Sequence, residues 1–502
     1  MNQFRSNLAA NFVGTGWAAL IQLACVPFFI KLMGIESYGL VGFYITMLVS
    51  LQVLDLGISP TMNRELARYS VQPDRTDEMR DFVRTLEVGY WGMGIVLGGL
   101  VVAAAPMISH SWINAEAVPE EDVTHAVMLM GALLALQWPL SFYQGGLRGL
   151  QRQVVLNGVK ILTATLSSAG AVFVLWALSP KITAFFAWQV AVAVLHVILI
   201  TRSMWSRVRA GSRAARFDLA VVRRVAEFAA GMSGIALFSM ILVQMDKIVL
   251  SKMLSLEMFG YYVLAGTVVG ALHLFISPIF EATFPRLSAL VACGDEGAIR
   301  NLYHSGTQLM AVLILPIAII IAMFSFEVVH LWTGDANAGL RAAPIVTFLI
   351  VGTAINGLMH MPYALQLAYG WTSIGVRLTV FKVVVFLPLL IYMARHYGVV
   401  GAASVWALLN VVYLAIALPL THRRLLQGEA KKWLVRDVGL AFAAALAIAL
   451  AARWLLPADM GKLQAFFGLA VATAGSVAAA IYVTPHVRTR ILEFALNRGL
   501  RT

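Results

Sequence analysis

The chain has 502 residues, of which 60% are hydrophobic and only 12% are charged, and its formal net charge is +12. A soluble protein of this length carries about twice that charged fraction, so the composition excludes a water-exposed globular protein. The apolar runs are about twenty residues long and do not alternate with polar residues, which indicates helices that cross a bilayer and excludes an outer-membrane barrel. Nucleic acid is not an expected partner, because the basic residues lie in short loops between apolar runs.

We predict an all-α polytopic membrane protein with fourteen membrane-spanning helices, one for each apolar run of sufficient length. The predicted spans are residues 10–30, 39–60, 86–108, 125–147, 154–178, 182–201, 226–250, 259–282, 305–330, 342–368, 374–394, 400–421, 438–456 and 464–485. No small-residue cleavage site follows the first run, so we expect an uncleaved first helix rather than a signal peptide.

The sequence contains an internal duplication. Residues 31–39 (KLMGIESYG) return as residues 252–260 (KMLSLEMFG), and each copy is followed by an apolar run that meets an Ile-Ser-Pro triplet. The offset from 31 to 252 is 221 residues, and Gly149 and Gly370 share it. The offset matches spans one to six with spans seven to twelve and leaves two extra C-terminal spans. Two six-helix parallel repeats are expected to enclose a central cavity, as in transporters. The proline of each triplet is expected to kink or end its helix.

The basic residues predict the orientation. Lys and Arg number 27 in the loops on the side of the N-terminus and 7 in the loops on the other side, which predicts that both termini are cytoplasmic in an inner membrane. The predicted domains are an N-lobe at 1–201, a basic cytoplasmic linker at 202–225, a C-lobe at 226–421, and the last two spans with a cytoplasmic tail at 422–502.

Few ionisable residues lie inside the predicted spans, and each costs about 2.5–3.5 kcal/mol to insert. Lys382 is the deepest, either as a buried ion pair or as a cationic group in the cavity, and Lys160 either extends to the headgroups or faces the cavity. Asp246 and Lys247 are adjacent, so they should point about 100° apart and should not pair well with each other. Asp55 lies near the inner end of the second span.

The motifs of the main enzyme classes are missing from the sequence. There is no Walker A, zinc or nucleophile motif, so we expect no enzyme activity, no metal and no cofactor. Polyprenyl-dependent glycosyltransferases need acidic residues in a sizeable first outer loop, and here the loop at 31–38 has one acid. The parallel repeats favour a transporter over these enzymes.

Residues 11–68 resemble the N-terminal signature of the Wzx-like bacterial polysaccharide flippases, which belong to the MOP (multidrug/oligosaccharidyl-lipid/polysaccharide) exporter superfamily. The resemblance depends on Lys31, Glu36, Tyr38 and Gly39, on Asp55-Leu56-Gly57, on Arg64-Glu65, and on FPRLSAL at 284–290. An arrangement of six, six and two spans also fits this family.

The resemblance implies a flippase that moves undecaprenyl-diphosphate-linked oligosaccharide from the inner to the outer leaflet by alternating access. A diphosphate crossing hydrocarbon needs cationic groups to replace its water. The expected cationic cavity contains Lys382, Lys160 and Lys247, with Arg64 and Arg148 at its cytoplasmic mouth. Ion coupling, if present, would use Asp55 or Asp246.

Three other functions stay open. A lipid II flippase of the same superfamily also has fourteen spans and a cationic cavity. A drug/cation antiporter of this fold usually has twelve spans, which the two extra spans argue against. A membrane scaffold of a polysaccharide assembly complex would not transport at all. For the flippase, expected partners are the lipid-linked glycan, the bilayer, and polysaccharide polymerase and chain-length proteins.

Overall fold

A computed structural model describes residues 2–52, 58–70, 72–208, 210–223, 244–457 and 460–489. Over these ranges the chain is helical, apart from turns, loops and one isolated bridge between Asn114 and Ser255. Eleven of the described helices are long and apolar enough to cross a membrane, which makes this a multi-pass membrane protein. The chain divides into two units, Met1–Gly260 and Tyr261–Thr502.

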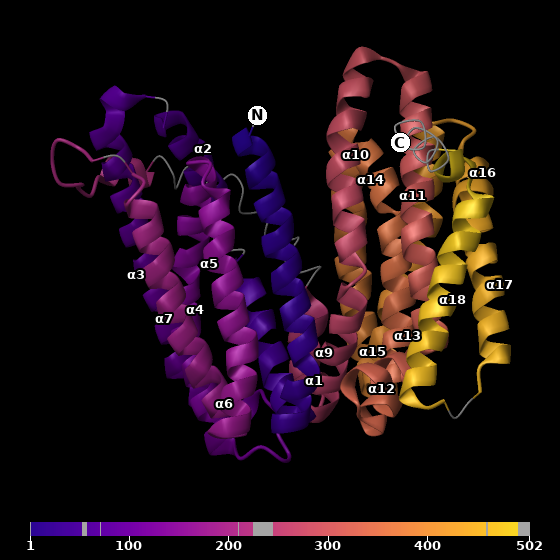
Figure 1. Cartoon of the computed structure of the whole chain (residues 1–502), viewed down its shortest axis with the longest axis horizontal. Helices are drawn as coiled ribbons and strands as arrows, with labels where there is room; N and C mark the ends of the chain where they lie inside the picture. The colour runs from indigo at the N-terminus through magenta and orange to yellow at the C-terminus, as the bar shows by residue number, and fades with distance from the viewer. Residues whose placement is uncertain are drawn as a thin grey trace, which may run out of the picture. The chain divides into compact units, whose positions relative to one another are not determined.

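The first unit contains the first six predicted spans (Figure 1). Its elements are α1 (Asn2–Gln52), α2 (Ile58–Ser70), η2 (Pro73–Arg75), α3 (Thr76–Ser111), α4 (Glu120–Gly149), α5 (Gln153–Thr165), η3 (Leu166–Gly170), α6 (Ala171–Ala177) and α7 (Ile182–Trp205). α1 is broken at Gly34, whose φ of 83° is in the left-handed region that favours glycine. The predicted spans 10–30 and 39–60 lie on either side of this break.

α4 is the core helix of the first unit, and α2, α3 and α7 pack against it. Small residues bring α3 and α4 together: a Cβ on Gly98 would lie 2.4 Å from the carbonyl oxygen of Gly131, and a Cβ on Gly131 would lie 2.7 Å from that of Gly98. Close contact through small residues is the usual means of packing helices inside a membrane, where apolar burial does not drive association. Phe82, Phe142 and Leu147 belong to the adjoining core.

The two copies of the repeated turn are in contact inside the first unit. A Cβ on Gly39 would lie 2.6 Å from the carbonyl oxygen of Leu256, and a Cβ on Gly260 would lie 2.4 Å from that of Ile35. Ile35 and Leu256 are separated by the same offset as Gly39 and Gly260, so the contact is reciprocal. Glycine is therefore required at both positions of the repeat, where a side chain would collide with backbone.

The loop after α3 forms hydrogen bonds with both copies of the repeated turn. The Glu36 carboxylate, which is buried, accepts hydrogen bonds from the backbone N–H of Glu116 at 2.5 Å and of Ala117 at 2.8 Å. The backbone N–H of Leu256 donates to the carbonyl of Asn114 at 2.7 Å. One loop thus joins the first and second copies of the repeated turn.

The second unit contains the remaining described helices. After α9 (Leu256–Gly270), which begins in the first unit, come α10 (His273–Cys293), α11 (Glu296–Met323), α12 (Ser325–Thr333), α13 (Ala336–Leu358), α14 (His360–Ala368), α15 (Thr372–Arg424), α16 (Ala430–Lys432), η4 (Trp433–Gly439), α17 (Leu440–Leu455) and α18 (Lys462–Val483). α11 is its core helix and packs on α10, α13, α17 and α18. α15 is broken at Gly398, with φ 59°, between the predicted spans 374–394 and 400–421.

Three expectations need correction or qualification. The predicted span 259–282 is not continuous, because α9 ends at Gly270 and α10 begins at His273. Pro278 lies inside α10, so the second Ile-Ser-Pro triplet does not end its helix. Most of the predicted span 226–250 falls in residues 224–243, outside the described residues, and the count of fourteen stays a prediction.

Candidate functional site

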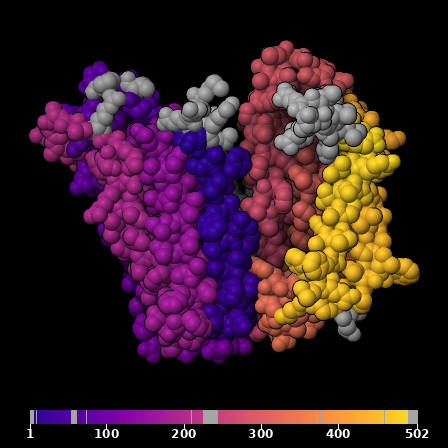
Figure 2. All heavy atoms as spheres, viewed as in Figure 1, coloured from indigo at the N-terminus to yellow at the C-terminus, as the bar shows by residue number. Residues whose placement is uncertain are grey.

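A polar cavity of about 490 Å³ lies within the first unit, between α1, α4, α5, η3 and α7. α1 and α5 form one side of it, and their surfaces run beside each other in Figure 2. Its polar lining consists of Asn11, Thr15, Gln137, Gln144, Arg148, Asn157, Lys160, Thr163, Ser167, Gln189 and His196. None of the described lining residues is acidic, so the cavity has a positive charge.

Lys160 is held at the interface of α5 with α1. Its Nζ donates to Thr15 Oγ1 at 3.3 Å, and one turn earlier Asn157 Nδ2 donates to Asn11 Oδ1 at 2.6 Å. Gly14 allows this approach, because a Cβ there would lie 2.3 Å from Asn157 Oδ1. The ammonium group of Lys160 thus lines the cavity, and its hydrogen-bond partner is a neutral hydroxyl. This contact does not neutralise the positive charge.

Arg148 brings a second positive charge to the same cavity from the last turn of α4. Its Nη2 lies 3.4 Å from Gln144 Oε1, again a neutral partner. A guanidinium, an ammonium and several side-chain amides are the groups that bind phosphate oxygens by charge-assisted hydrogen bonds. The lining can therefore hold an anionic, polyhydroxylated group.

Three of the five predicted cationic residues do not line this cavity. Arg64, on α2, is exposed and pairs with Glu65 at 3.0 Å. Lys247 lies 3.5 Å from the carboxylate of Asp246, so these neighbours form an ion pair although the helix geometry predicts that they pair poorly. The long lysine side chain reaches back to the preceding residue although the two Cβ atoms diverge.

Lys382 belongs to the second unit, on α15. Its Nζ lies 3.3 Å from the centre of the Tyr413 ring, a cation–π contact. No carboxylate within the described ranges forms an ion pair with it, which leaves the aromatic face as its partner. Asp55, the other predicted ion-coupling residue besides Asp246, lies outside the described residues.

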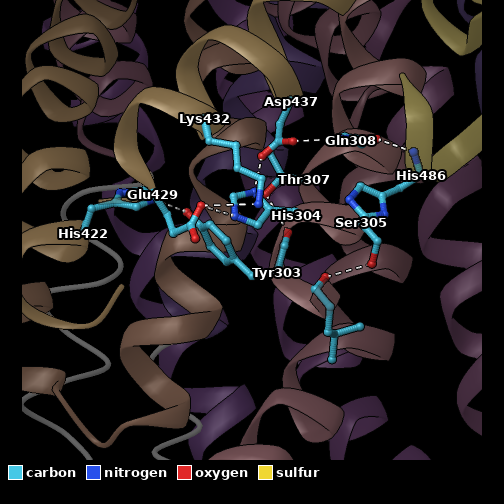
Figure 3. Close-up of polar contacts among 11 residues, drawn as sticks. Tyr303, His304, Ser305, Thr307, Gln308, His422, Glu429, Lys432, Asp437 and His486 are labelled. Atoms are coloured by element: carbon cyan, nitrogen blue, oxygen red, sulfur yellow. Dashed lines mark hydrogen bonds and ion pairs between the residues drawn. The ribbon is translucent and has the colours of Figure 1, made fainter. Parts of the chain in front are cut away.

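A second polar centre, which the sequence did not indicate, is buried in the second unit (Figure 3). His304 on α11 lies between two carboxylates: Nδ1 bonds Asp437 Oδ2, and Nε2 lies 3.1 Å from Glu429 Oε2. Gln308 Nε2 donates to Asp437 Oδ1 at 2.8 Å. The side chains of His304 and Asp437 are 1% and 0% exposed. A buried acid needs such partners, and this one connects α11 to η4 ahead of α17.

Burial and neighbouring charged side chains shift the pKa values of two residues at the edge of this centre. Partial burial acts to raise the pKa of Glu429, but Lys432, 3.4 Å away, and His304 outweigh it and lower that pKa. Burial lowers the pKa of His486, whose backbone N–H donates to Gln308 Oε1 at 3.0 Å. The cluster therefore ties three segments, α11, the 429–437 region and the chain after α18, into one network.

The fold is similar to those of solved membrane transporters. A solved structure of the lipid II flippase MurJ in an inward closed conformation has a TM-score of 0.71 and 10% identity to this chain, covering 94% of this chain and 97% of that chain. An inward-facing multidrug resistance MATE family transporter of the MOP superfamily has a TM-score of 0.65 and 15% identity, covering 83% and 96%. At these identities the likeness concerns the fold alone.

Sequence comparison narrows the class to a family. Residues 4–291, more than half of the chain, match the family model described as "Polysaccharide biosynthesis protein". The chain belongs to this family. It is also 21% identical over 420 residues to a Shigella flexneri protein named "Putative O-antigen transporter", covering 84% of this chain and 97% of that protein.

Proposed function

We propose that this protein is a flippase that moves an undecaprenyl-diphosphate-linked oligosaccharide from the cytoplasmic to the periplasmic leaflet of the inner membrane. The observation that carries the proposal is the cavity lined by Lys160 and Arg148 with side-chain amides and without a described acid. A diphosphate requires cations in place of water, and sugar hydroxyls require amide and hydroxyl partners. Membership of the polysaccharide biosynthesis family and the O-antigen relative support a glycan as the cargo.

The proposed architecture has fourteen spans, two parallel six-helix repeats, two extra C-terminal helices and both termini in the cytoplasm. The reciprocal contact of Gly39 and Gly260 with the opposite copy of the repeated turn supports the duplication. The breaks at Gly34 and Gly398 support counting α1 and α15 as two spans each. Parallel repeats that rock against each other would give alternating access.

The remaining predicted residues take proposed roles along the path. Lys382 and Lys247 are proposed as further cationic contacts for the diphosphate, and Arg64 as a contact at the cytoplasmic mouth. The interior-negative membrane potential favours outward movement of an anion, by about 2.3 kcal/mol per charge per 100 mV. Asp55 and Asp246 stay as proposals for ion coupling, and polymerase and chain-length proteins as proposed partners.

The test in cells uses Lys160→Ala and Lys382→Ala in a strain that lacks the chromosomal copy. Both variants are expected to lower surface polysaccharide while the amount of protein in the membrane is unchanged, because each removes a positive charge from the path. Lys181→Ala is the matched control, since Lys181 is exposed and pairs with Asp122 at 3.3 Å. Normal surface polysaccharide in the Lys160 variant would remove the cavity from the transport path.

Lipid II is the second candidate cargo, because the structure with a TM-score of 0.71 is a lipid II flippase. The two cargoes share a polyprenyl diphosphate and differ in the attached group. Complementation separates them: the gene should restore surface polysaccharide in a strain that lacks its own polysaccharide flippase. Rescue of peptidoglycan synthesis instead would favour lipid II.

A further inference from the structure

A groove on the first unit lies between α3 and α7, with α4 as its floor. Both helices pack on α4, and the three helices are labelled together in Figure 1. The hollow between them measures about 740 Å³ and is separate from the cavity that contains Lys160. Its α3 wall runs from Arg84 to Ile95, which is about 16 Å at 1.5 Å per residue. That length is about half the thickness of the hydrocarbon core.

One end of the groove is positively charged. Arg84 and Arg202 line it from opposite walls, and both are exposed. Arg84 Nη1 donates to Glu87 at 2.7 Å, and this carboxylate, 6% exposed, also accepts from Tyr143 Oη at 2.6 Å and Trp205 Nε1 at 2.9 Å. Arg202 forms no ion pair with the described part of the chain. Arg84 thus contacts a buried carboxylate that two further donors already engage, Arg202 has no such pair among the described residues, and guanidinium donors remain for an incoming anion.

The other end of the groove is apolar and open. Val88 and Ile198, each one turn from an arginine, begin this apolar part, Ile95 lies at its far end, and all three are exposed. Between them, a Cβ added to Gly92 would meet no atom within 4 Å, so the missing side chain leaves room along the wall. The lining of the groove therefore changes along its length from basic to apolar. An amphiphilic lipid changes in the same order, from its headgroup to its acyl chain.

We propose that this groove binds a membrane phospholipid with an anionic headgroup, whose phosphate contacts Arg84 and Arg202 and whose acyl chain lies along Val88, Ile95 and Ile198. Basic pockets between membrane helices at the cytoplasmic surface are suited to anionic lipids, and the predicted orientation puts the arginine end on that side. The site lies outside the proposed transport cavity and does not depend on what the protein transports.

The test is native mass spectrometry of the purified full chain, delipidated and then titrated with phosphatidylglycerol or with phosphatidylcholine of the same acyl chains. We expect one retained phosphatidylglycerol per chain and a clear preference over phosphatidylcholine. Removing both charges, in Arg84→Gln with Arg202→Gln, should weaken phosphatidylglycerol binding about 30-fold. Gly92→Leu fills the apolar end without changing charge and should weaken both lipids alike.

Matched controls separate the site from general effects. Arg286→Gln with Arg300→Gln removes two charges from the predicted cytoplasmic side of the second unit. Gly99→Leu adds the same side chain to α3, at a position where a Cβ also meets nothing within 4 Å but which does not line the groove. Both controls should retain phosphatidylglycerol as the unaltered chain does. If the double arginine variant loses its monodisperse elution, Gly92→Leu decides alone.

Three results would overturn the proposal. Equal retention of the two phospholipids by the unaltered chain would remove the role of charge. If soluble glycerol phosphate bound as tightly as phosphatidylglycerol, the acyl chain would have no role in binding. Displacement of phosphatidylglycerol by undecaprenyl phosphate at equal concentration would assign the groove to the substrate tail. Because none of these measurements requires transport, failure here leaves the proposed flippase activity untouched, and the reverse also holds.

Discussion

Replacing Asp437 by asparagine removes one charge from the buried cluster of the second unit. The carboxylate is 0% exposed and contacts His304 and Gln308, so no water can take its place. Removing one partner of a buried ion pair costs about 3–5 kcal/mol, and here His304 is left with the partly exposed Glu429 in place of a fully buried carboxylate. We expect the free energy of unfolding to fall by about that amount. The control is Glu296→Gln, which breaks an exposed pair with Arg300 at the start of α11, the helix that contains His304. This change should cost about 0–1 kcal/mol.

The measurement is reversible unfolding of the purified protein in mixed micelles, followed by tryptophan fluorescence. His304→Leu combined with Asp437→Leu removes both charges together and should recover much of the stability lost in Asp437→Asn, since apolar replacement of a whole buried pair is often close to neutral. If Asp437→Asn lowered the free energy of unfolding by less than about 1 kcal/mol, the buried pair would contribute no more than an exposed ion pair does. That result would refute the argument from burial. A double variant that is less stable than Asp437→Asn would do the same.

Two further substitutions test the contact between the repeated turns. Gly39→Ala places a Cβ 2.6 Å from a backbone oxygen, so the helices must separate, and we expect a loss of about 1–3 kcal/mol in the same unfolding assay. Gly89→Ala, where a Cβ meets nothing within 4 Å, should be neutral, and equal effects would contradict the close approach. Glu36→Ala removes the acceptor of two backbone N–H groups, so hydrogen exchange at Glu116 and Ala117 should become faster. Unchanged exchange there would show that the loop is held by other contacts.

The sequence was sufficient to predict the features that depend on local composition. Eleven of the described helices are apolar and long enough to span a membrane, as apolar runs predict, and the breaks at Gly34 and Gly398 lie between pairs of predicted spans. Lys160 stands out as one of the few charges inside a predicted span and Arg148 as a charge at the predicted cytoplasmic mouth, and both line one cavity. The break at 270–273 was missed because an uninterrupted apolar run does not reveal a change of helix direction inside it.

Features that depend on distant residues could not be predicted. His304 and Asp437 are 133 positions apart and sit close to predicted span ends, where ionisable groups are common and call for no partner. Glu36 was noticed only as part of the repeated motif, because its acceptor role requires the loop near residue 116. Asn11, Thr15 and Gln189 gave no signal, since single polar residues in a long apolar run are inexpensive. Only the helix packing shows that they face a common space.

The most direct test of the account is transport by the purified protein in liposomes. A lipid-linked oligosaccharide with a fluorescent sugar is added to the inner leaflet, and its appearance outside is followed by a membrane-impermeant quencher. We expect the unaltered chain and Lys181→Gln to flip the lipid, and Lys160→Gln combined with Arg148→Gln to flip it at least about tenfold more slowly, which corresponds to a barrier about 1.4 kcal/mol higher. Equal rates in the double variant and the unaltered chain would contradict the claim that this cavity carries the anionic headgroup.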